Sequence, residues 1–318
     1  CVSGGEVQAA LDAGFPADKI VFAGVGKADW EINLGLDNDI FCFNVESAVE
    51  LEIINELAAA KNKVASIALR INPEVDAHTH AKITTGMKEN KFGINLSQLG
   101  GVLDKLKEMK HVKLIGIHSH IGSQITDMSS FRNLVIRFNE IQEELEAHGV
   151  TVENLNFGGG LGIDYYHPNH LSIPAFDNYF AAIHKLLQVR PGQQVHFEPG
   201  RSIVAQCGTL ISKVLYVKEG ETKKFAILDA GFTELIRPAM YDAYHRIENI
   251  SSDEAVETYD VVGPICESSD VFGKDVELNK AHRGDLIALR SAGAYGEVMA
   301  SQYNCRHLPK AYYSDTIK

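Results

Sequence analysis

The chain has 318 residues, of which 45% are hydrophobic, and a formal net charge of −12 at pH 7. This length and apolar content can bury one large core or two unequal ones. The negative charge argues against nucleic acid and anionic membranes as partners, although a local site can still be basic. No apolar run approaches the ~18 residues of a membrane span. Five scattered cysteines are typical of reduced thiols in a cytoplasmic protein.

Short apolar segments alternate with amphipathic segments over the first two thirds of the chain. The apolar segments predict strands at 20–22, 40–43, 64–71, 112–118, 155–157 and 195–197. The amphipathic segments predict helices at 5–13, 28–34, 47–60, 97–109, 129–148 and 175–189. This alternation indicates a parallel α/β fold, either doubly wound or a (β/α)8 barrel.

The number of strands favours the barrel. Six strands are visible and a seventh is expected to end at Val2, whereas a closed barrel needs eight. Polar and glycine-rich residues also follow the strands directly, at the ends that converge on one face of a barrel. We therefore expect residues 1–206 to form a (β/α)8 TIM-type barrel that lacks its first strand in this chain. After Arg201 the segments are short and β-rich, so residues 207–318 are expected to form a second, mainly β domain.

Two of the strand ends carry motifs suited to an anionic ligand. Gly158-Gly159-Gly160-Leu161-Gly162 lets backbone amides approach a phosphate, or is simply a tight turn. Glu198-Pro199-Gly200-Arg201 follows the last barrel strand, where barrels often bind phosphate. Arg201 supplies a fork of donors. Glu198 is either the salt-bridge partner of Arg201 or a carboxylate that faces a cationic ring nitrogen.

A third strand end carries His118 and His120, which point the same way if the strand continues. Such a pair would suit a metal-dependent barrel hydrolase. The other strand ends offer glycines and an arginine instead of further ligands, so we expect no metal. Asp76, His78 and His80 form a similar cluster, which we interpret as a solvated loop.

Six motifs in one order resemble the diaminopimelate decarboxylases, which are pyridoxal-phosphate-dependent barrel decarboxylases of the alanine-racemase-like fold. The resemblance extends from Cys1 to about Ala311 and is specific because all six are in register. The motifs are His118–Gln124, Phe157–Gly162, Glu198–Arg201, Asp229–Gly231 with Arg237–Tyr241, Gly263–Asp270 and Gly293–Gly296.

The resemblance implies a set of residues that bind pyridoxal 5′-phosphate. His120 stacks on the cofactor ring, and Glu198 pairs with the pyridinium nitrogen so that the ring remains an effective electron sink. The rest of the cofactor-binding set, most of it at the phosphate, is Ser123, Gly158, Gly159, Gly160, Pro199, Gly200, Arg201 and Tyr295.

The resemblance also implies substrate-binding and catalytic residues. Cys266 is the catalytic proton donor, contributed across the interface of a homodimer, and Glu267 contacts the amino group at the far end of the substrate. The substrate carboxylates are held by Arg201, Arg237 and Tyr241, and Tyr295 touches both substrate and cofactor phosphate. Without the motif context, Cys266 would be interpreted as an inert thiol and the tyrosines as packing residues.

The lysine that forms the Schiff base in this family is expected on the first barrel strand, shortly before Cys1. Neither Lys27 nor Lys91 lies in a matching context. We therefore expect the chain to be truncated at its N-terminus, and an upstream sequence with a strand-end lysine would agree with this expectation.

The resemblance implies decarboxylation of meso-2,6-diaminopimelate to L-lysine and CO2, a step of lysine biosynthesis. Three alternatives remain. The first is a related decarboxylase acting on ornithine, arginine or carboxynorspermidine, which Arg237 and Glu267 disfavour. The second is the metal-dependent hydrolase, which tightly bound zinc would support. The third is a non-catalytic binding homologue, which the absence of the lysine from the full gene would support.

Overall fold

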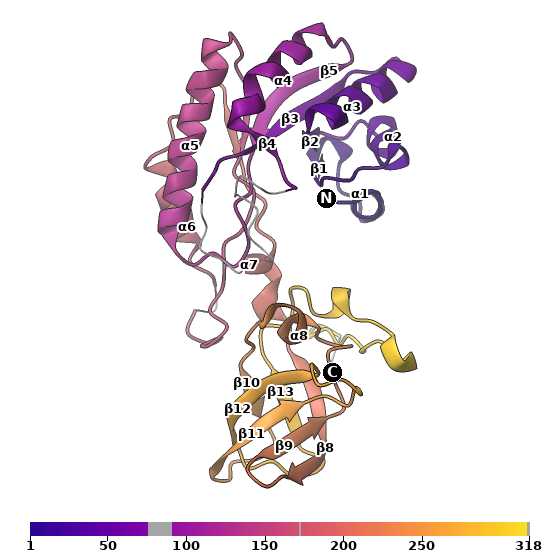
Figure 1. Ribbon diagram of the computed structural model, residues 1–318, viewed down its shortest axis with the longest axis vertical. Helices are drawn as coiled ribbons and strands as arrows, with labels where there is room; N and C mark the ends of the chain where they lie inside the picture. Colours follow the sequence, from indigo (N-terminus) through magenta and orange to yellow (C-terminus); the bar gives the residue numbers. More distant parts are fainter. Residues whose placement is uncertain (76–90, 172, 317–318) are drawn as a thin grey trace. The chain divides into compact units, whose positions relative to one another are not determined.

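The computed structural model describes residues 1–75, 91–171 and 173–316 (Figure 1). The chain divides into two compact units, which are described separately below. Unit 1 comprises Cys1–Gly160 and Asp177–Pro199, and unit 2 comprises Leu161–Phe176 and Gly200–Lys318. The chain therefore enters unit 2 twice, first within the glycine motif between Gly160 and Leu161, and again between Pro199 and Gly200. The predicted domain boundary at residue 206 stays a prediction.

Unit 1 contains a curled parallel sheet flanked by helices (Figure 1). The strand order is β1-β2-β3-β5-β6-β7, and β4 pairs with β3. The strands are β1 (Val21–Phe22), β2 (Cys42–Val45), β3 (Ala65–Asn72), β4 (Ile94–Asn95), β5 (Val112–His118), β6 (Asn154–Asn156) and β7 (Gln194–His196). The helices are α1 (Gly4–Asp12), α2 (Asp29–Asp37), α3 (Ala48–Ala60), α4 (Leu96–Glu108), α5 (Met128–Ala147) and α6 (Phe176–His184).

All six predicted strands and all six predicted helices of this region are present, with shifts of a few residues at their ends. Residues 1 and 2, where a strand was predicted to end, do not form a regular strand. Cys1 nevertheless donates its N-terminal amine to the carbonyl of Val21 and accepts from the amide of Ala23, the pattern of a neighbour alongside β1. The short strand β4 was missed because two residues show no periodicity.

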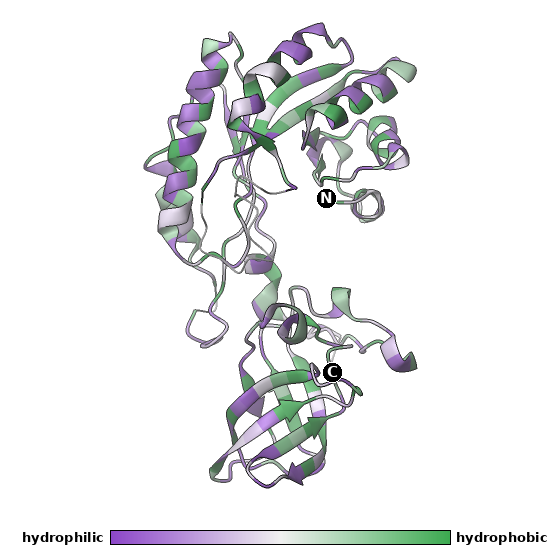
Figure 2. Ribbon diagram, viewed as in Figure 1, coloured by the Kyte–Doolittle hydropathy of each residue, from purple (hydrophilic) through white to green (hydrophobic). Residues whose placement is uncertain are grey.

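The helices of unit 1 form because apolar spacing and polar caps agree. In α5 the predicted apolar face is buried, including Phe131, Leu134 and Phe138. The side chain of Asp127 caps this helix by accepting from the amide of Ser129, and Ser47 caps α3 in the same manner. Figure 2 shows the mixed hydropathy of α5 beside the more uniformly hydrophobic strands. This packing fixes the strand ends that carry the motifs.

Unit 2 is mainly β and holds a six-stranded sheet of order β10-β13-β8-β9-β11-β12. All neighbouring pairs are antiparallel except β9 with β11. The strands are β8 (Leu210–Glu219), β9 (Lys224–Leu228), β10 (Ile247–Asn249), β11 (Val256–Val262), β12 (Val271–Asn279) and β13 (Leu286–Leu289), and the helices are α7 (Arg201–Val204) and α8 (Arg237–Tyr241). A short 3₁₀ turn, Glu297–Met299, follows the Gly293–Gly296 motif. The predicted fold class, a parallel barrel-type sheet followed by a mainly β domain, is confirmed.

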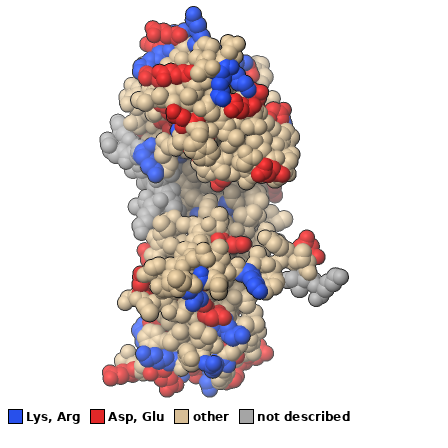
Figure 3. Space-filling model, turned by 90° about the vertical axis from the view of Figure 1, so that its right-hand side faces the viewer, with Lys and Arg blue, Asp and Glu red and all other residues tan. Residues whose placement is uncertain are grey.

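The surface carries both signs of charge. On the face shown in Figure 3, acidic and basic side chains are interspersed. Within the described ranges, no helix is long and apolar enough to cross a membrane.

Candidate active site

Glu198 lies two residues after β7, at the carboxyl end of the parallel sheet, and contacts side chains from three other strands. Its Oε1 accepts hydrogen bonds from Nδ2 of Asn156 at 2.8 Å and from Nδ2 of Asn44 at 3.4 Å. Nε2 of His118 lies 3.5 Å from Oε2, a distance longer than a usual hydrogen bond. Asn44, His118 and Asn156 belong to β2, β5 and β6, so the cluster depends on parallel strands ending at the same edge.

The carboxyl group of Glu198 is ionised at neutral pH. Burial alone would raise its pKa, but His118, the hydrogen bond from Asn156 and the nearby His120 together hold the pKa well below the usual range. The side chain also remains 36% exposed. Glu198 is therefore a charged and accessible carboxylate that two amides and an imidazole hold in place.

His120 presents an uncharged ring beside this carboxylate. Burial lowers its pKa to about 4, and the positive charge of Arg70 on β3 contributes to the shift. Its Nδ1 accepts a hydrogen bond of 3.1 Å from the amide of Gly159, so the other ring nitrogen carries the proton. A flat, neutral ring is suited to stacking on an aromatic cofactor.

The glycine motif packs its backbone against two neighbouring loops. A Cβ atom on Gly159 would lie 2.2 Å from the carbonyl oxygen of Glu198, and one on Gly160 would lie 2.5 Å from that of Gly122. The amides of Gly158 and Gly159 donate to Asn156 and His120, respectively. Close packing thus explains the glycines here, and phosphate binding by this loop stays a prediction.

These groups of unit 1 fit pyridoxal phosphate on chemical grounds. The neutral ring of His120 suits one face of a pyridine, and the ionised Glu198 suits a protonated ring nitrogen. Ser123, a further residue of the predicted cofactor set, is half-buried in the loop that follows His120. Pro199 ends unit 1, one residue after Glu198.

Arg201 and Arg237 are brought together in unit 2 by a tyrosine that the sequence analysis did not single out. The hydroxyl of Tyr165 accepts from Nη1 of Arg201 at 2.9 Å and from Nη1 of Arg237 at 3.1 Å. The two arginines are only 6% and 5% exposed, respectively. Arg201 also lies 5.0 Å from the ring centre of Tyr295, whose hydroxyl is close to Gly200. Tyr165 follows the glycine motif closely, which is the only sequence signal that could have indicated it.

His245 contacts the same arginine from a segment beyond α8. Its Nε2 lies 2.8 Å from Nη1 of Arg237, and its Nδ1 lies 2.8 Å from the backbone carbonyl of Arg290. A guanidinium can only donate and a carbonyl can only accept, so the imidazole is neutral with its proton on Nδ1. Burial lowers the pKa of His245 to about 4, and the nearby arginines favour the same neutral form.

The depressed pKa of His245 predicts a loss of stability in mild acid. The unfolded chain binds a proton near pH 6.5 whereas the folded chain does not, so this contribution is present above pH 6.5 and is lost as the pH falls towards 4. Between pH 7.5 and pH 5, the free energy of unfolding should fall by about 2 kcal/mol more in the wild type than in His245→Gln. Denaturant titrations at both pH values measure the difference. The exposed His170→Gln variant is the control, and equal losses in all three proteins would contradict the prediction.

Cys266 and Glu267 lie on an exposed turn between β11 and β12. Oε1 of Glu267 accepts a 2.7 Å hydrogen bond from the hydroxyl of Tyr303. The buried Asp270 holds the base of the turn by accepting from the amides of Phe232 and Ile265, both at 2.7 Å. The turn therefore presents a thiol and a carboxylate outward from a rigid base. Tyr241, the remaining predicted substrate contact, is half-buried at the end of α8.

The histidines considered as metal ligands have other surroundings. His118 is buried beside Glu198, and His120 accepts from the glycine loop. Asp76, His78 and His80 lie outside the described residues. Among the described residues, no group of three or more His, Cys, Asp or Glu side chains is placed to hold a metal ion.

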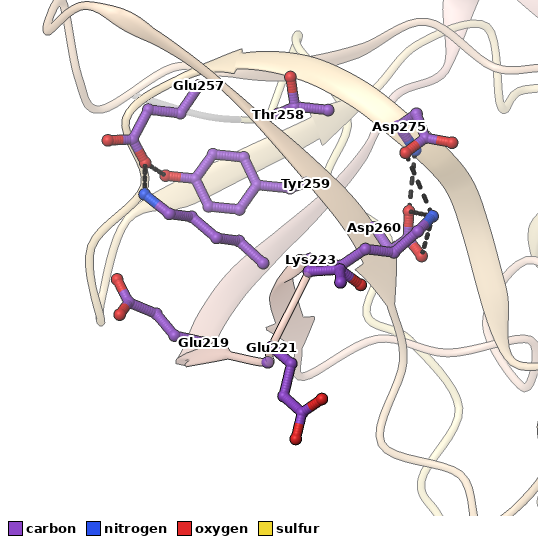
Figure 4. A pocket seen from close by; sticks show the side chains of 11 residues that line it. Glu219, Glu221, Lys223, Glu257, Thr258, Tyr259, Asp260 and Asp275 are labelled. Atoms are coloured by element: carbon purple, nitrogen blue, oxygen red, sulfur yellow. Dashed lines mark hydrogen bonds and ion pairs between the residues drawn. The ribbon is translucent and has the colours of Figure 1, made fainter.

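A surface hollow of about 490 Å³ lies on the β sheet of unit 2, where β9, β11 and β12 meet (Figure 4). Its lysines are already paired: Lys223 contacts Asp260 and Asp275, and Lys224 contacts Glu257. None of the residues that line it belongs to the predicted site. We assign this hollow no role in the reaction.

The comparisons with known proteins agree with the chemistry of the site. Residues 1–205 match the family model of the pyridoxal-dependent decarboxylases, pyridoxal binding domain. A diaminopimelate decarboxylase of Bacteroides thetaiotaomicron is 68% identical over 317 residues, covering 100% of this chain and 82% of the relative. One of Haemophilus influenzae is 45% identical, covering 96% of this chain and 73% of the relative.

Solved structures lead to the same family. A crystal structure of diaminopimelate decarboxylase from Helicobacter pylori complexed with L-lysine has a TM-score of 0.89 and 42% identity, covering 96% of this chain and 75% of that chain. A crystal structure of diaminopimelate decarboxylase from M. jannaschii has a TM-score of 0.87 and 41% identity, covering 96% of this chain and 71% of that chain.

The parallel sheet, the accessible carboxylate and the neutral histidine at its edge thus define a pyridoxal-phosphate-dependent enzyme of the barrel class. Relatives of high identity exist over nearly the whole chain. The chain belongs to the diaminopimelate decarboxylases.

Proposed function

We propose that the protein removes CO2 from meso-2,6-diaminopimelate to give L-lysine. The observation that carries this proposal is the 68% identity, over the full chain, to a diaminopimelate decarboxylase. Pyridoxal phosphate, when bound, supplies the electron sink that accepts the electron pair left on the α-carbon as CO2 departs. The ionised Glu198 would keep the ring nitrogen protonated, and the neutral His120 would support the ring by stacking.

The remaining residues of the cofactor-binding set complete this proposal. The phosphate would be held by Ser123, the glycine loop Gly158–Gly160, Pro199, Gly200, Arg201 and Tyr295. The hydroxyls of Ser123 and Tyr295 and the guanidinium fork of Arg201 are suitable donors for a phosphate. The chain spans 82% of the length of the Bacteroides thetaiotaomicron relative, so activity is measured on the full-length protein.

The arginines of unit 2 bind the substrate carboxylates in this proposal, with help from Tyr241. Buried guanidinium groups hold anions strongly because little water competes for them. Glu267 binds the distal amino group, and Cys266 returns a proton to the α-carbon. Both lie on an exposed turn, which supports their donation across the interface of a two-fold homodimer.

A decarboxylation assay tests the function. The full-length protein, loaded with pyridoxal phosphate, is expected to release CO2 and L-lysine in equal amounts from meso-diaminopimelate. Ornithine, arginine and carboxynorspermidine are tested in parallel. If CO2 is released faster from one of them, that compound and not diaminopimelate is the substrate. Binding of the cofactor without any CO2 release would indicate a binding homologue instead. Turnover abolished by a chelator and restored by zinc would favour the hydrolase.

We also propose that the protein works in the cytoplasm. All five cysteines lie in the described part of the chain and are free thiols, which fits a reducing compartment.

A further inference from the structure

The hydroxyl of Tyr165 connects the two buried arginines of unit 2. Arg201 and Arg237 each donate from Nη1 to this single oxygen. Both contacts use acceptor lone pairs of the oxygen, so they leave the hydroxyl proton available for donation to a further acceptor, such as a ligand carboxylate. A buried hydroxyl with an unused donor is costly unless a ligand satisfies it.

Arg237 carries its charge among neutral groups. The described partners of its guanidinium are the hydroxyl of Tyr165, Nε2 of His245 and the ring of Tyr165, whose centre is 4.9 Å away. Burial, with Arg201 as a further cause, lowers the pKa of Arg237, and Tyr165 opposes the shift. A nearly buried cation without an anion of its own is destabilising by itself. An incoming carboxylate would offset that cost, so the arrangement is suited to binding an anionic ligand.

We propose that Tyr165 and His245 are positioning residues for substrate recognition. Tyr165 holds the guanidinium groups of Arg201 and Arg237 at a spacing set by one shared oxygen, and His245 fixes the other side of Arg237. The receptor so formed takes the carboxylates of a diacid, and this inference rests on the proposed function. Neutrality of His245 is required because a protonated imidazole would lose its acceptor and repel the arginine.

The main test is Tyr165→Phe, which removes only the shared oxygen and keeps the ring. Tyr166→Phe is the matched control, because Tyr166 is 61% exposed and its ring stacks on Tyr244 at 4.2 Å. Two quantities are compared between the wild type and the two variants. They are the KM for meso-diaminopimelate, and the dissociation constant of pimelate measured by calorimetry. Pimelate has both carboxylates but no amino group, so its binding needs no turnover.

We expect Tyr165→Phe to raise the KM and the pimelate dissociation constant roughly tenfold to a hundredfold, because each arginine loses a hydrogen bond to its support. Tyr166→Phe should behave as the wild type. Unchanged pimelate binding in Tyr165→Phe would overturn the inference. So would a loss that appears equally in cofactor affinity and melting temperature while pimelate binding is retained.

His245 offers a second, independent comparison. Gln can accept from Arg237 and donate to the carbonyl of Arg290, whereas Leu can do neither. His245→Leu should weaken pimelate binding, and His245→Gln should restore much of it. Equal binding by both variants would overturn the role of His245. If the wild type binds pimelate but releases no CO2 from diaminopimelate, the proposed function fails separately from this inference.

Discussion

Replacing Glu198 with Gln should lower kcat of the full-length enzyme by roughly a hundredfold or more, the usual scale for losing one preorganised electrostatic contact. Glu198 is ionised and 36% exposed, and the amides of Asn44 and Asn156 orient its Oε1. A Gln side chain has nearly the same shape but cannot offer a negative charge to a protonated ring nitrogen. The fold should therefore persist while the chemical step slows.

The measurement compares kcat, cofactor affinity and melting temperature in the same variant. Glu153→Gln is the control, because the side chain of this glutamate is exposed and lies 3.9 Å from Nζ of Lys113, a weak surface contact. If Glu198 is instead a structural ion-pair partner, turnover should stay near normal while cofactor binding and stability decline. That pattern would exclude the ring-nitrogen role.

Mixing two inactive variants should restore activity if the active site is shared in a homodimer. Arg201→Ala removes a predicted carboxylate and phosphate contact, and Cys266→Ala removes the predicted proton donor. In a mixed dimer with shared sites, one site carries both changes and the other carries neither. Random mixing should therefore recover about a quarter of the wild-type rate, because half of the dimers have one intact site of two.

The control for this experiment mixes Cys266→Ala with Glu267→Ala. Both residues lie on the same turn, so one protomer would contribute both to a given site, and neither site of the mixed dimer would be intact. No recovery in verified Arg201→Ala/Cys266→Ala heterodimers would contradict the shared site. Recovery of activity in the control pair would contradict the prediction that Cys266 and Glu267 of one active site come from the same protomer.

Most elements of the parallel sheet could be predicted because local spacing determines them. In helix α5 the apolar residues recur at the helical period of three to four residues, and these residues are buried. Strands β3 and β5 are apolar runs between turns. The sheet of unit 2 was harder to predict. Strand β12 lies at one edge of the sheet and mixes apolar with charged residues irregularly, and β10 is three residues long, so neither shows a clear two-residue period.

The sequence by itself identified the family, the cofactor and the motif residues, since those depend on residue types in a fixed order. Only the tertiary structure placed Asn44 and Asn156 on Glu198, across 154 and 42 residues of chain, respectively. It also brought Tyr165 to Arg237, which is 72 residues away, and gave His245 its neutral form. Such contacts depend on strand order and on the burial of each group, and neither is expressed in local periodicity.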